Sequence, residues 1–204
     1  MEIYIVRHGE TLWNRDKRLQ GSTNIELSDY GRELAIKTGN ALSDVRIDKI
    51  FSSPLIRAYE TAELIRNNRD IEIITDERIK ELNFGDFEGQ NFSELIANEA
   101  LTFKYFFKQP HLYEPDKNGE SLEHLIERAG NFMSEVIEPL EKDCERVMIV
   151  ADGALNKAIM SYVKKHAIKD FWSGGLQENC NVIIIDYSDN NYTIINETKL
   201  FYEK

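Results

Sequence analysis

The sequence of 204 residues is poor in several features, and each shortage excludes a class of protein. It has only two cysteines, Cys144 and Cys180, without a Cys-x-x-Cys pair, so no disulfide can be assigned and reduced thiols are expected. No apolar run approaches the roughly 18 residues of a membrane span. The first residues lack the basic segment and apolar core of a signal peptide. These shortages indicate a cytoplasmic protein that does not span a membrane.

Positive charge is also scarce in this chain. It has 25 Lys and Arg against 36 Asp and Glu, a formal net charge of −11. This balance argues against nucleic acid or an anionic membrane as the main partner. An acidic protein that binds an acidic metabolite needs a local basic pocket, so arginines inside motifs carry particular weight. The length suffices for one well-buried domain with at most a modest cap, and the 42% apolar content is that of an ordinary globular protein.

Strand-like and helix-like patterns alternate along the chain, without repeats or low-complexity linkers. Apolar runs typical of strands recur at 3–6, 47–51, 72–75, 146–151 and 181–186, with a weaker run at 192–199. Helix-like periodicity extends from Ser28, as N-cap, to about 43, and over about 55–67, 121–142 and 154–166. This alternation predicts βαβ units and a mainly parallel sheet. The Asp-Asn-Asn segment 189–191 predicts a hairpin that adds an antiparallel edge.

The stretch from about 90 to 120 interrupts the alternation. Its aromatic residues and helix-breaking residues are Phe92, Phe103, Tyr105, Phe106, Phe107, Pro110, Tyr113, Pro115 and Gly119. One interpretation is an amphipathic helix whose aromatic side chains pack on the main body. The other is a cap over the carboxyl ends of the strands, whose aromatic side chains shape a substrate cavity. Both can hold together, and we expect a single domain over 1–204 with this cap-like insertion.

The most informative motif, Arg7-His8-Gly9, follows directly behind the apolar run 3–6. An isolated His is more often structural than catalytic. This one has a cation before it, a glycine that allows close backbone approach, and a buried strand behind it. That strand would deliver the pair to the sheet edge where open α/β folds bind ligands. His8 is therefore a candidate nucleophile, with Arg7 as its neighbouring cation.

A second motif places another arginine near the same edge. The strand-like run that ends at Phe51 is followed by Pro54, which begins a helix where its missing N–H costs nothing. Arg57 then lies in the first helical turn, where free N–H groups and the helix dipole already favour anions. An isolated arginine would more often be a solvated surface residue. Next to a strand-end Arg-His pair, Arg57 is better explained as an anion-binding residue.

A third motif, 80–89, is an acidic loop with two glycines behind a predicted strand. Glu81, Asp86 and Glu88 are its candidate general acids, and surface charge is the alternative for each. Glu81 lies closest to the strand end, so we choose it as the acid.

Together, these motifs resemble those of the histidine phosphatase superfamily, the phosphoglycerate mutase-like family, and the similarity covers nearly the whole chain. They are Arg-His-Gly-Glu-Thr-x-x-Asn, Ser-Ser-Pro-Leu-x-Arg-Ala-x-Glu-Thr-Ala and Glu-x-x-x-Gly-x-x-Glu-Gly, followed by a Gly-Glu-Ser at 119–121. The resemblance implies a three-layer α/β/α sandwich with a small helical cap, and a covalent phosphohistidine on His8. It also implies that Arg7 and Arg57 clamp the phosphoryl group, that Asn14 contacts it, and that Glu81 donates a proton. No metal or other cofactor is implied.

One position departs from the family's pattern. The family completes its phosphate pocket with a second His, in a His-Gly pair just after a late strand, whereas here the run 147–151 ends in Asp152 and Gly153. An ionised Asp only accepts hydrogen bonds, and at about 4 Å from phosphate it costs on the order of 4 kcal/mol for an effective dielectric of about 20. We therefore expect weak phosphate binding and slow turnover unless Asp152 is protonated. When no phosphate is bound, we expect it to pair with Arg7 or Arg57 as a partial phosphate mimic.

Three functions remain open for a chain whose partner is a small phosphorylated metabolite. The segment 18–21 resembles the Gln-Gly segment of the smaller phosphatases, which favours a phosphomonoester hydrolase with Gln20 and Gly21 among its substrate-binding residues. A phosphoglycerate mutase, an isomerase, must retain its phosphoenzyme and exclude water, and no extra closing segment is present. A non-catalytic phosphate-binding protein is the third possibility, suggested by Asp152 alone. A homodimer is possible through the C-terminal edge strand.

Overall fold

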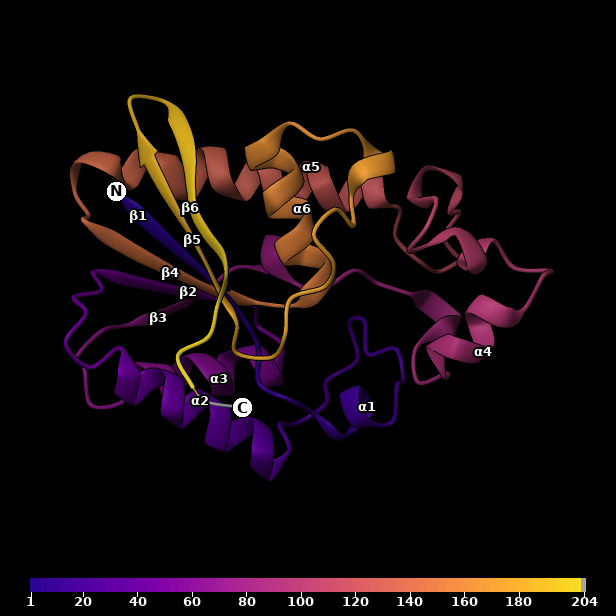
Figure 1. The fold of residues 1–204 in the computed structure, drawn as a ribbon, viewed down its shortest axis with the longest axis horizontal. Helices are drawn as coiled ribbons and strands as arrows, with labels where there is room; N and C mark the ends of the chain where they lie inside the picture. The colour runs from indigo at the N-terminus through magenta and orange to yellow at the C-terminus, as the bar shows by residue number, and fades with distance from the viewer. Residues whose placement is uncertain (203–204) are drawn as a thin grey trace.

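A six-stranded sheet forms the middle layer of the computed structural model, which describes residues 1–202 (Figure 1). Its strands, in the spatial order β3-β2-β4-β1-β5-β6, are β1 (Glu2–Arg7), β2 (Lys49–Ser52), β3 (Ile73–Thr75), β4 (Arg146–Ala151), β5 (Val182–Ser188) and β6 (Asn191–Lys199). The strands from β3 to β1 are parallel to one another, and β5 and β6 add to them in antiparallel fashion. The predicted mainly parallel sheet with an antiparallel edge is confirmed.

Helices cover both faces of this sheet (Figure 1). The pair α2 (Asp29–Ala41) and α3 (Ile56–Arg66) packs on one face, and the pair α5 (Leu122–Phe132) and α6 (Gly153–Lys164) packs on the other. A separate cluster of buried apolar side chains lies on each side. The central strands β1 and β4 are buried on both faces, as their continuous apolar sequences require. The fold is therefore the three-layer α/β/α sandwich.

The helix predicted over 121–142 is regular only as far as Phe132. A π-helical segment, Met133–Ile137, and a 3-10 segment, Glu138–Lys142, continue it. Pro139 explains the change of pitch, because proline has no N–H to donate and its ring displaces the carbonyl four residues earlier.

The C-terminal hairpin follows from the residues of its turn. Asp189 and Asn190 both have positive φ, at 52° and 61°, a backbone conformation that Asp and Asn adopt more readily than most residues. Asn191 was predicted to belong to the turn, but it begins β6 and pairs with Ser188. The connection is thus a two-residue turn, the length that best fits the twist of a hairpin.

Residues 90–120 form a lobe on the side of the sheet toward which β1 and β4 run (Figure 1). It contains α4 (Phe92–Ala97) and two 3-10 turns, Thr102–Tyr105 and Pro110–Leu112. A single amphipathic helix over this stretch is therefore wrong. Prolines at 110 and 115 interrupt it, and the chain folds into short turns instead.

The packing of this lobe is nevertheless aromatic, as the sequence suggested. Phe103, Phe106 and Tyr113 are buried, and their ring centroids lie 4.8 to 5.9 Å apart. Phe84, from the acidic loop of the main body, joins them 5.4 Å from Phe106. These contacts fix the lobe against the sheet layer.

Two expectations from composition concern the described residues 1–202. No helix in this range has the length and apolar character needed to cross a membrane. Cys144 and Cys180 are both buried free thiols.

Candidate active site

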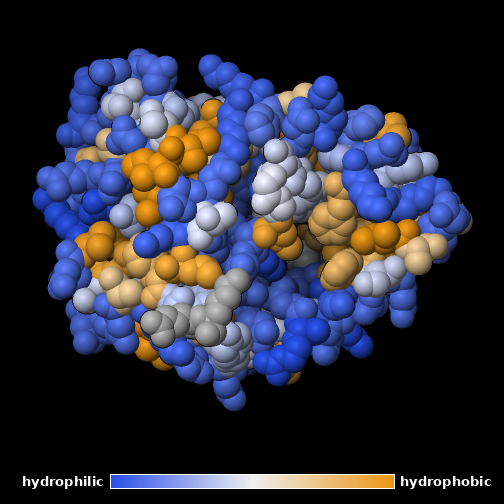
Figure 2. Space-filling model, in the orientation of Figure 1, coloured by the Kyte–Doolittle hydropathy of each residue, from blue (hydrophilic) through white to orange (hydrophobic). Residues whose placement is uncertain are grey.

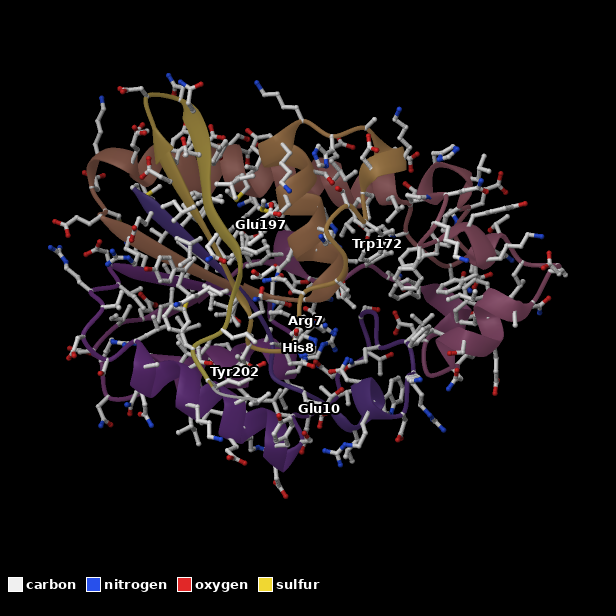
Figure 3. The ribbon with its side chains drawn as sticks, viewed as in Figure 1. Arg7, His8, Glu10, Trp172, Glu197 and Tyr202 are labelled. Carbon is white, nitrogen blue, oxygen red and sulfur yellow. The ribbon has the colours of Figure 1, made fainter. Side chains whose placement is uncertain are left out.

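A cavity of about 300 Å³ opens at the carboxyl ends of β1 and β4, beside the lobe. It is the edge at which parallel α/β sheets present their ligand-binding residues. Every site residue predicted from the sequence lines it, namely Arg7, His8, Asn14, Gln20, Gly21, Arg57, Glu81 and Asp152. Figure 3 shows Arg7 and His8 next to each other near the centre of the molecule. Segments more than 140 residues apart in sequence therefore meet around one small space.

The imidazole of His8 is fixed in one tautomer. Its backbone N–H donates to the Ala151 carbonyl of β4 at 2.9 Å, which places the residue directly behind the sheet edge. Its Nδ1 lies 2.6 Å from the Gly9 carbonyl oxygen, and because a carbonyl can only accept, Nδ1 carries the proton. Nε2 therefore presents its lone pair. Burial lowers the pKa of His8 well below its ordinary value, and Arg57 and Arg7 lower it further, so the ring is neutral near pH 7.

Arg57 is completely buried and its guanidinium makes three hydrogen bonds. Nε donates to Oδ1 of Asp152 at 2.5 Å, and the two terminal nitrogens donate to the carbonyls of Gly21 at 2.6 Å and Thr23 at 2.8 Å. The first turn of α3 thus brings Arg57 inward rather than to the solvated face. The loop at 20–24 determines the plane in which its guanidinium lies.

The carboxylate of Glu88 holds the loop at 20–24 in place through hydrogen bonds. Its oxygens accept from the backbone N–H groups of Ser22 at 2.8 Å and Thr23 at 2.9 Å, and from both hydroxyl groups. Gly21 has a φ of 54°, and a Cβ there would lie 2.0 Å from a Glu88 oxygen. Glu88 is therefore an anchor of the loop and does not line the cavity. Asp86, the other alternative acid, is exposed and accepts from the Asn118 amide.

Glu81 lies against the beginning of α6. Its carboxylate accepts from the backbone N–H groups of Ala154 and Leu155, each at 3.0 Å, and from that of Leu82 at 2.8 Å. These bonds satisfy helix N–H groups that have no partner within the helix. Burial, followed by the charge of Asp152, raises the pKa of Glu81 to about 7. The group can therefore both give and take a proton near neutral pH.

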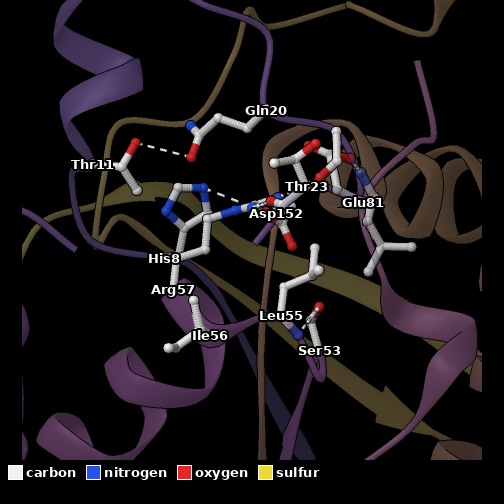
Figure 4. Close-up of polar contacts among 12 residues, drawn as sticks. His8, Thr11, Gln20, Thr23, Ser53, Leu55, Ile56, Arg57, Glu81 and Asp152 are labelled. Atoms are coloured by element: carbon white, nitrogen blue, oxygen red, sulfur yellow. Dashed lines mark hydrogen bonds and ion pairs between the residues drawn. The ribbon is translucent and has the colours of Figure 1, made fainter. Parts of the chain in front are cut away.

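Asp152 is close to both the candidate nucleophile and the arginine (Figure 4). It has no exposed surface, and its Oδ1 lies 2.5 Å from Nε of Arg57 and 3.5 Å from Nε2 of His8. Of the two pairings expected for Asp152, the structure has the one with Arg57. Burial raises the pKa of Asp152, whereas Arg57 and Arg7 act in the opposite direction. Since Nε2 of His8 has no proton, only the protonated form of Asp152 can make a hydrogen bond to it.

The amides of Asn14 and Gln20 are both oriented by Thr11. Thr11 Oγ1 donates to Oε1 of Gln20 at 2.9 Å, and the Thr11 backbone N–H donates to Oδ1 of Asn14 at 3.1 Å. With both amide oxygens engaged, the NH₂ groups are the ends left to donate to a bound anion. The sequence singled out both amides but gave no indication that Thr11 orients them.

Sequence reasoning missed the loop that follows α6. Within it, the Gln177 carbonyl accepts from the guanidinium of Arg7, and Asn179 donates to the His8 carbonyl at 2.9 Å. Trp172 and Leu176 from the same loop line the cavity. Isolated Gln, Asn and Trp residues carry no spacing that a motif could reveal. Among the described residues 1–202, no group of three or more His, Cys, Asp or Glu side chains is placed to hold a metal ion.

Comparison with known proteins gives matches that cover most of the chain and agree with one another. Residues 3–198 match the model of the histidine phosphatase superfamily (branch 1). The phosphoglycerate mutase-like protein 4 of Arabidopsis thaliana is 31% identical over 170 residues, covering 82% of this chain and 73% of the relative. Phosphoserine phosphatase 1 of Hydrogenobacter thermophilus is 29% identical, covering 96% and 90%. The solved structure of Bacillus stearothermophilus YhfR has 31% identity and a TM-score of 0.88, with 98% and 99% covered.

Proposed function

Because the chain belongs to the histidine phosphatase superfamily, we propose that it hydrolyses phosphomonoesters through a phosphohistidine on His8. The observation that carries the proposal is the state of that ring. Nε2 has an unprotonated lone pair, faces the cavity between two arginines, and lies in the same cavity as an acid whose pKa is about 7. A small phosphorylated metabolite in the cytoplasm is the substrate we envisage.

The reaction has two steps, in which His8 carries the phosphoryl group and Glu81 carries the proton. In the first, Nε2 of His8 bonds to phosphorus, the ester P–O bond breaks, and Glu81 gives its proton to the leaving oxygen. In the second, Glu81 takes a proton from water as the water oxygen attacks the phosphohistidine, which releases phosphate and restores the ring. The guanidinium of Arg7 and the amides of Asn14 and Gln20 hold the phosphoryl oxygens, since phosphoryl transfer depends mainly on position and charge stabilisation.

Asp152 impairs this reaction in our proposal. Its Oδ1 occupies the Nε donor of Arg57 that a phosphoryl oxygen would otherwise take, and it stands within 3.5 Å of the attacking nitrogen. An ionised carboxylate at about 4 Å repels each unit of negative charge on the substrate by on the order of 4 kcal/mol for an effective dielectric of about 20, about a thousandfold in affinity or rate. Protonation of Asp152 removes this repulsion and supplies a donor for a phosphoryl oxygen.

The decisive experiment is detection of phosphohistidine on His8 during turnover of p-nitrophenyl phosphate. We expect a weak signal from the native chain, a strong signal and faster turnover from Asp152→His, and none from His8→Ala. If Asp152→His does not raise turnover, Asp152 does not impair the site. If neither the native chain nor Asp152→His forms phosphohistidine with any ester of a panel, the chain is not a phosphatase of this type.

One observation favours a second candidate, a protein that binds phosphate without turnover. The buried carboxylate of Asp152, paired with Arg57, lies 3.5 Å from Nε2 of His8 and hinders its attack, while Arg7 and Arg18 still line the cavity for an anion. Tight phosphate binding by the native chain, with no phosphohistidine even in Asp152→His, would support that candidate. Mutase activity would instead appear as transfer between phosphoglycerates that depends on a bisphosphoglycerate primer.

A further inference from the structure

The cavity that contains His8 has a wall of aromatic side chains from two segments that are far apart in sequence. Phe92, Phe106 and Phe107 come from the lobe, and Trp172 comes from the loop behind α6. The ring centroid of Trp172 lies 5.2 Å from that of Phe106 and 4.9 Å from that of Phe107. Phe92 continues the wall, 6.2 Å from Phe107. The rings meet at steep angles, so they form a continuous apolar surface rather than an isolated stack.

These rings divide into two groups with different roles. Phe106 is buried and belongs to the packing of the lobe. Phe92, Phe107 and Trp172 are only partly buried, and Leu176 beside them is 46% exposed. Contiguous apolar surface around a cavity marks a ligand-binding wall, whereas packing alone would have buried it. Figure 2 shows apolar side chains along the rim of a hollow between the main body and the lobe, and Figure 3 places Trp172 at this junction.

The positions of the charged residues in the cavity limit which leaving alcohols can lie against the aromatic wall. Among the described residues that line the cavity, the carboxylates are Asp152, beside His8, and Glu81, against the beginning of α6. An ammonium group on the leaving alcohol would therefore find no carboxylate along the aromatic wall. Hydroxyl groups placed against the rings would lose their hydrogen bonds to water without a replacement. Lys17 and Arg18, on another side of the cavity, are exposed and remain solvated.

From this wall we infer that the substrate is a phosphomonoester of an apolar alcohol, with an aromatic ring or a group of similar size. The inference rests on the phosphomonoesterase activity proposed above and names its substrate class. The volume of about 300 Å³ is at the small end of ligand sites, which range over roughly 300–1,000 Å³, so it suits one or two rings. The bond changes are those given above, with the apolar alcohol leaving as it takes the proton of Glu81.

The test compares two esters whose leaving alcohols are of similar acidity, 2-phenylethyl phosphate and 2-hydroxyethyl phosphate. Their difference then reports on the wall and not on intrinsic reactivity. In both the native chain and Asp152→His we expect kcat/KM to be about ten- to hundredfold higher for the phenylethyl ester, because one ring is buried in the complex. Equal values for the two esters would overturn the inference and leave the phosphatase proposal intact.

Variants of the wall residues test whether the preference for the phenylethyl ester comes from these side chains. Phe107→Ala and Trp172→Ala should each remove most of it, through KM for the phenylethyl ester, with little change for the hydroxyethyl ester. Tyr105→Ala is the matched control, since Tyr105 is a partly exposed aromatic residue of the same lobe outside the cavity lining. Phe107→Leu and Trp172→Phe cover the case in which an alanine variant fails to fold, and each should lower the preference in part because it removes ring surface from the wall. If none of these changes alters the preference, the wall does not select the alcohol.

Binding to His8→Ala separates this inference from the proposed activity. That variant cannot form phosphohistidine, so calorimetry with each ester reports affinity alone. Tighter binding of 2-phenylethyl phosphate supports the wall even if no ester is turned over by any variant, an outcome that would contradict the phosphatase proposal. Equal binding of the two esters contradicts the wall whatever the rates are.

Discussion

Glu81 is the residue whose protonation the structure controls most directly. Backbone N–H groups of α6 hold its carboxylate, while burial and Asp152 raise its pKa to about 7. If Glu81 protonates the leaving oxygen, Glu81→Gln should lower the rate of phosphoenzyme formation from 2-hydroxyethyl phosphate by about 10² to 10⁴. The loss should be much smaller for p-nitrophenyl phosphate, because nitrophenolate leaves without a proton. Rapid chemical-quench measurement of phosphoenzyme formation checks this, with Asp86→Asn as the unchanged control.

The protonation of Glu81 predicts how the rate of phosphoenzyme formation depends on pH. Glu81 must be protonated for the first step, and its pKa is raised, so the rate of phosphoenzyme formation from an alkyl ester is full below about pH 7 and declines above it. The limiting slope is about tenfold per pH unit. The charge of Asp152 is one cause of the raised pKa, so Asp152→Asn should move the decline to lower pH. A decline that stays in place in this variant would mean that another group titrates.

At the scale of elements, the loop at 20–24 holds Arg57 and depends on Glu88. Four donors from Ser22 and Thr23 converge on that carboxylate, and hydrogen bonds to charged groups contribute about 1.5–3 kcal/mol each. Glu88→Ala should therefore raise KM and lower the free energy of unfolding by roughly 2–4 kcal/mol. Urea unfolding and steady-state kinetics measure both. Glu94→Ala, on the exposed side of α4, is the control expected to change neither.

Glu88 also illustrates which parts of the site a sequence can predict. The strands, the helix that begins near Pro54, and the placement of His8 and Arg57 follow from local patterns of apolar and turn residues. Whether Glu88 is an acid or an anchor depends on Thr23, 65 positions away. Gln177, whose carbonyl accepts a hydrogen bond from Arg7, is 170 positions away from it. Such contacts depend on the packing of whole elements, and no local pattern encodes them.

The lobe shows the same limit for secondary structure. Its aromatic content predicted apolar packing and a substrate-shaping role, and the buried rings of Phe103 and Phe106 bear out the packing. One interpretation of this stretch was an amphipathic helix packed on the main body, which the prolines and the tight turns prevent. The cavity wall also includes Trp172, a residue outside every motif, which contacts both the buried Phe106 and the partly exposed Phe107.

For the whole molecule, the site joins the two helical layers. Arg57 belongs to α3 on one face of the sheet, whereas Asp152 directly precedes α6 on the other. Their buried ion pair passes across the carboxyl end of the sheet, and each apolar cluster supports one partner. Removing one partner of a buried pair leaves an uncompensated charge, which costs several kcal/mol in general. An anion in the cavity can replace the carboxylate, so ligand binding and global stability are coupled here.

This coupling predicts how an anion stabilises the protein at different pH. Sulfate is a suitable probe, because it keeps two negative charges throughout the range from pH 5 to 8. The pKa of Glu81 is about 7 and burial raises the pKa of Asp152, so lowering the pH reduces the negative charge of this pair of carboxylates while His8, whose pKa is lowered, stays uncharged. Sulfate should therefore bind more tightly at pH 5.5 than at pH 8. Each tenfold gain in affinity adds about 1.4 kcal/mol of stability at saturating sulfate, or about 3–6 °C in Tm for a chain of this size. Thermal unfolding with sulfate, against sodium chloride at equal ionic strength, measures the difference. In Asp152→Asn the stabilisation by sulfate at pH 8 should be larger than in the native chain, and only the pH dependence that Glu81 causes should remain. A pH dependence as steep as that of the native chain would assign the whole effect to Glu81.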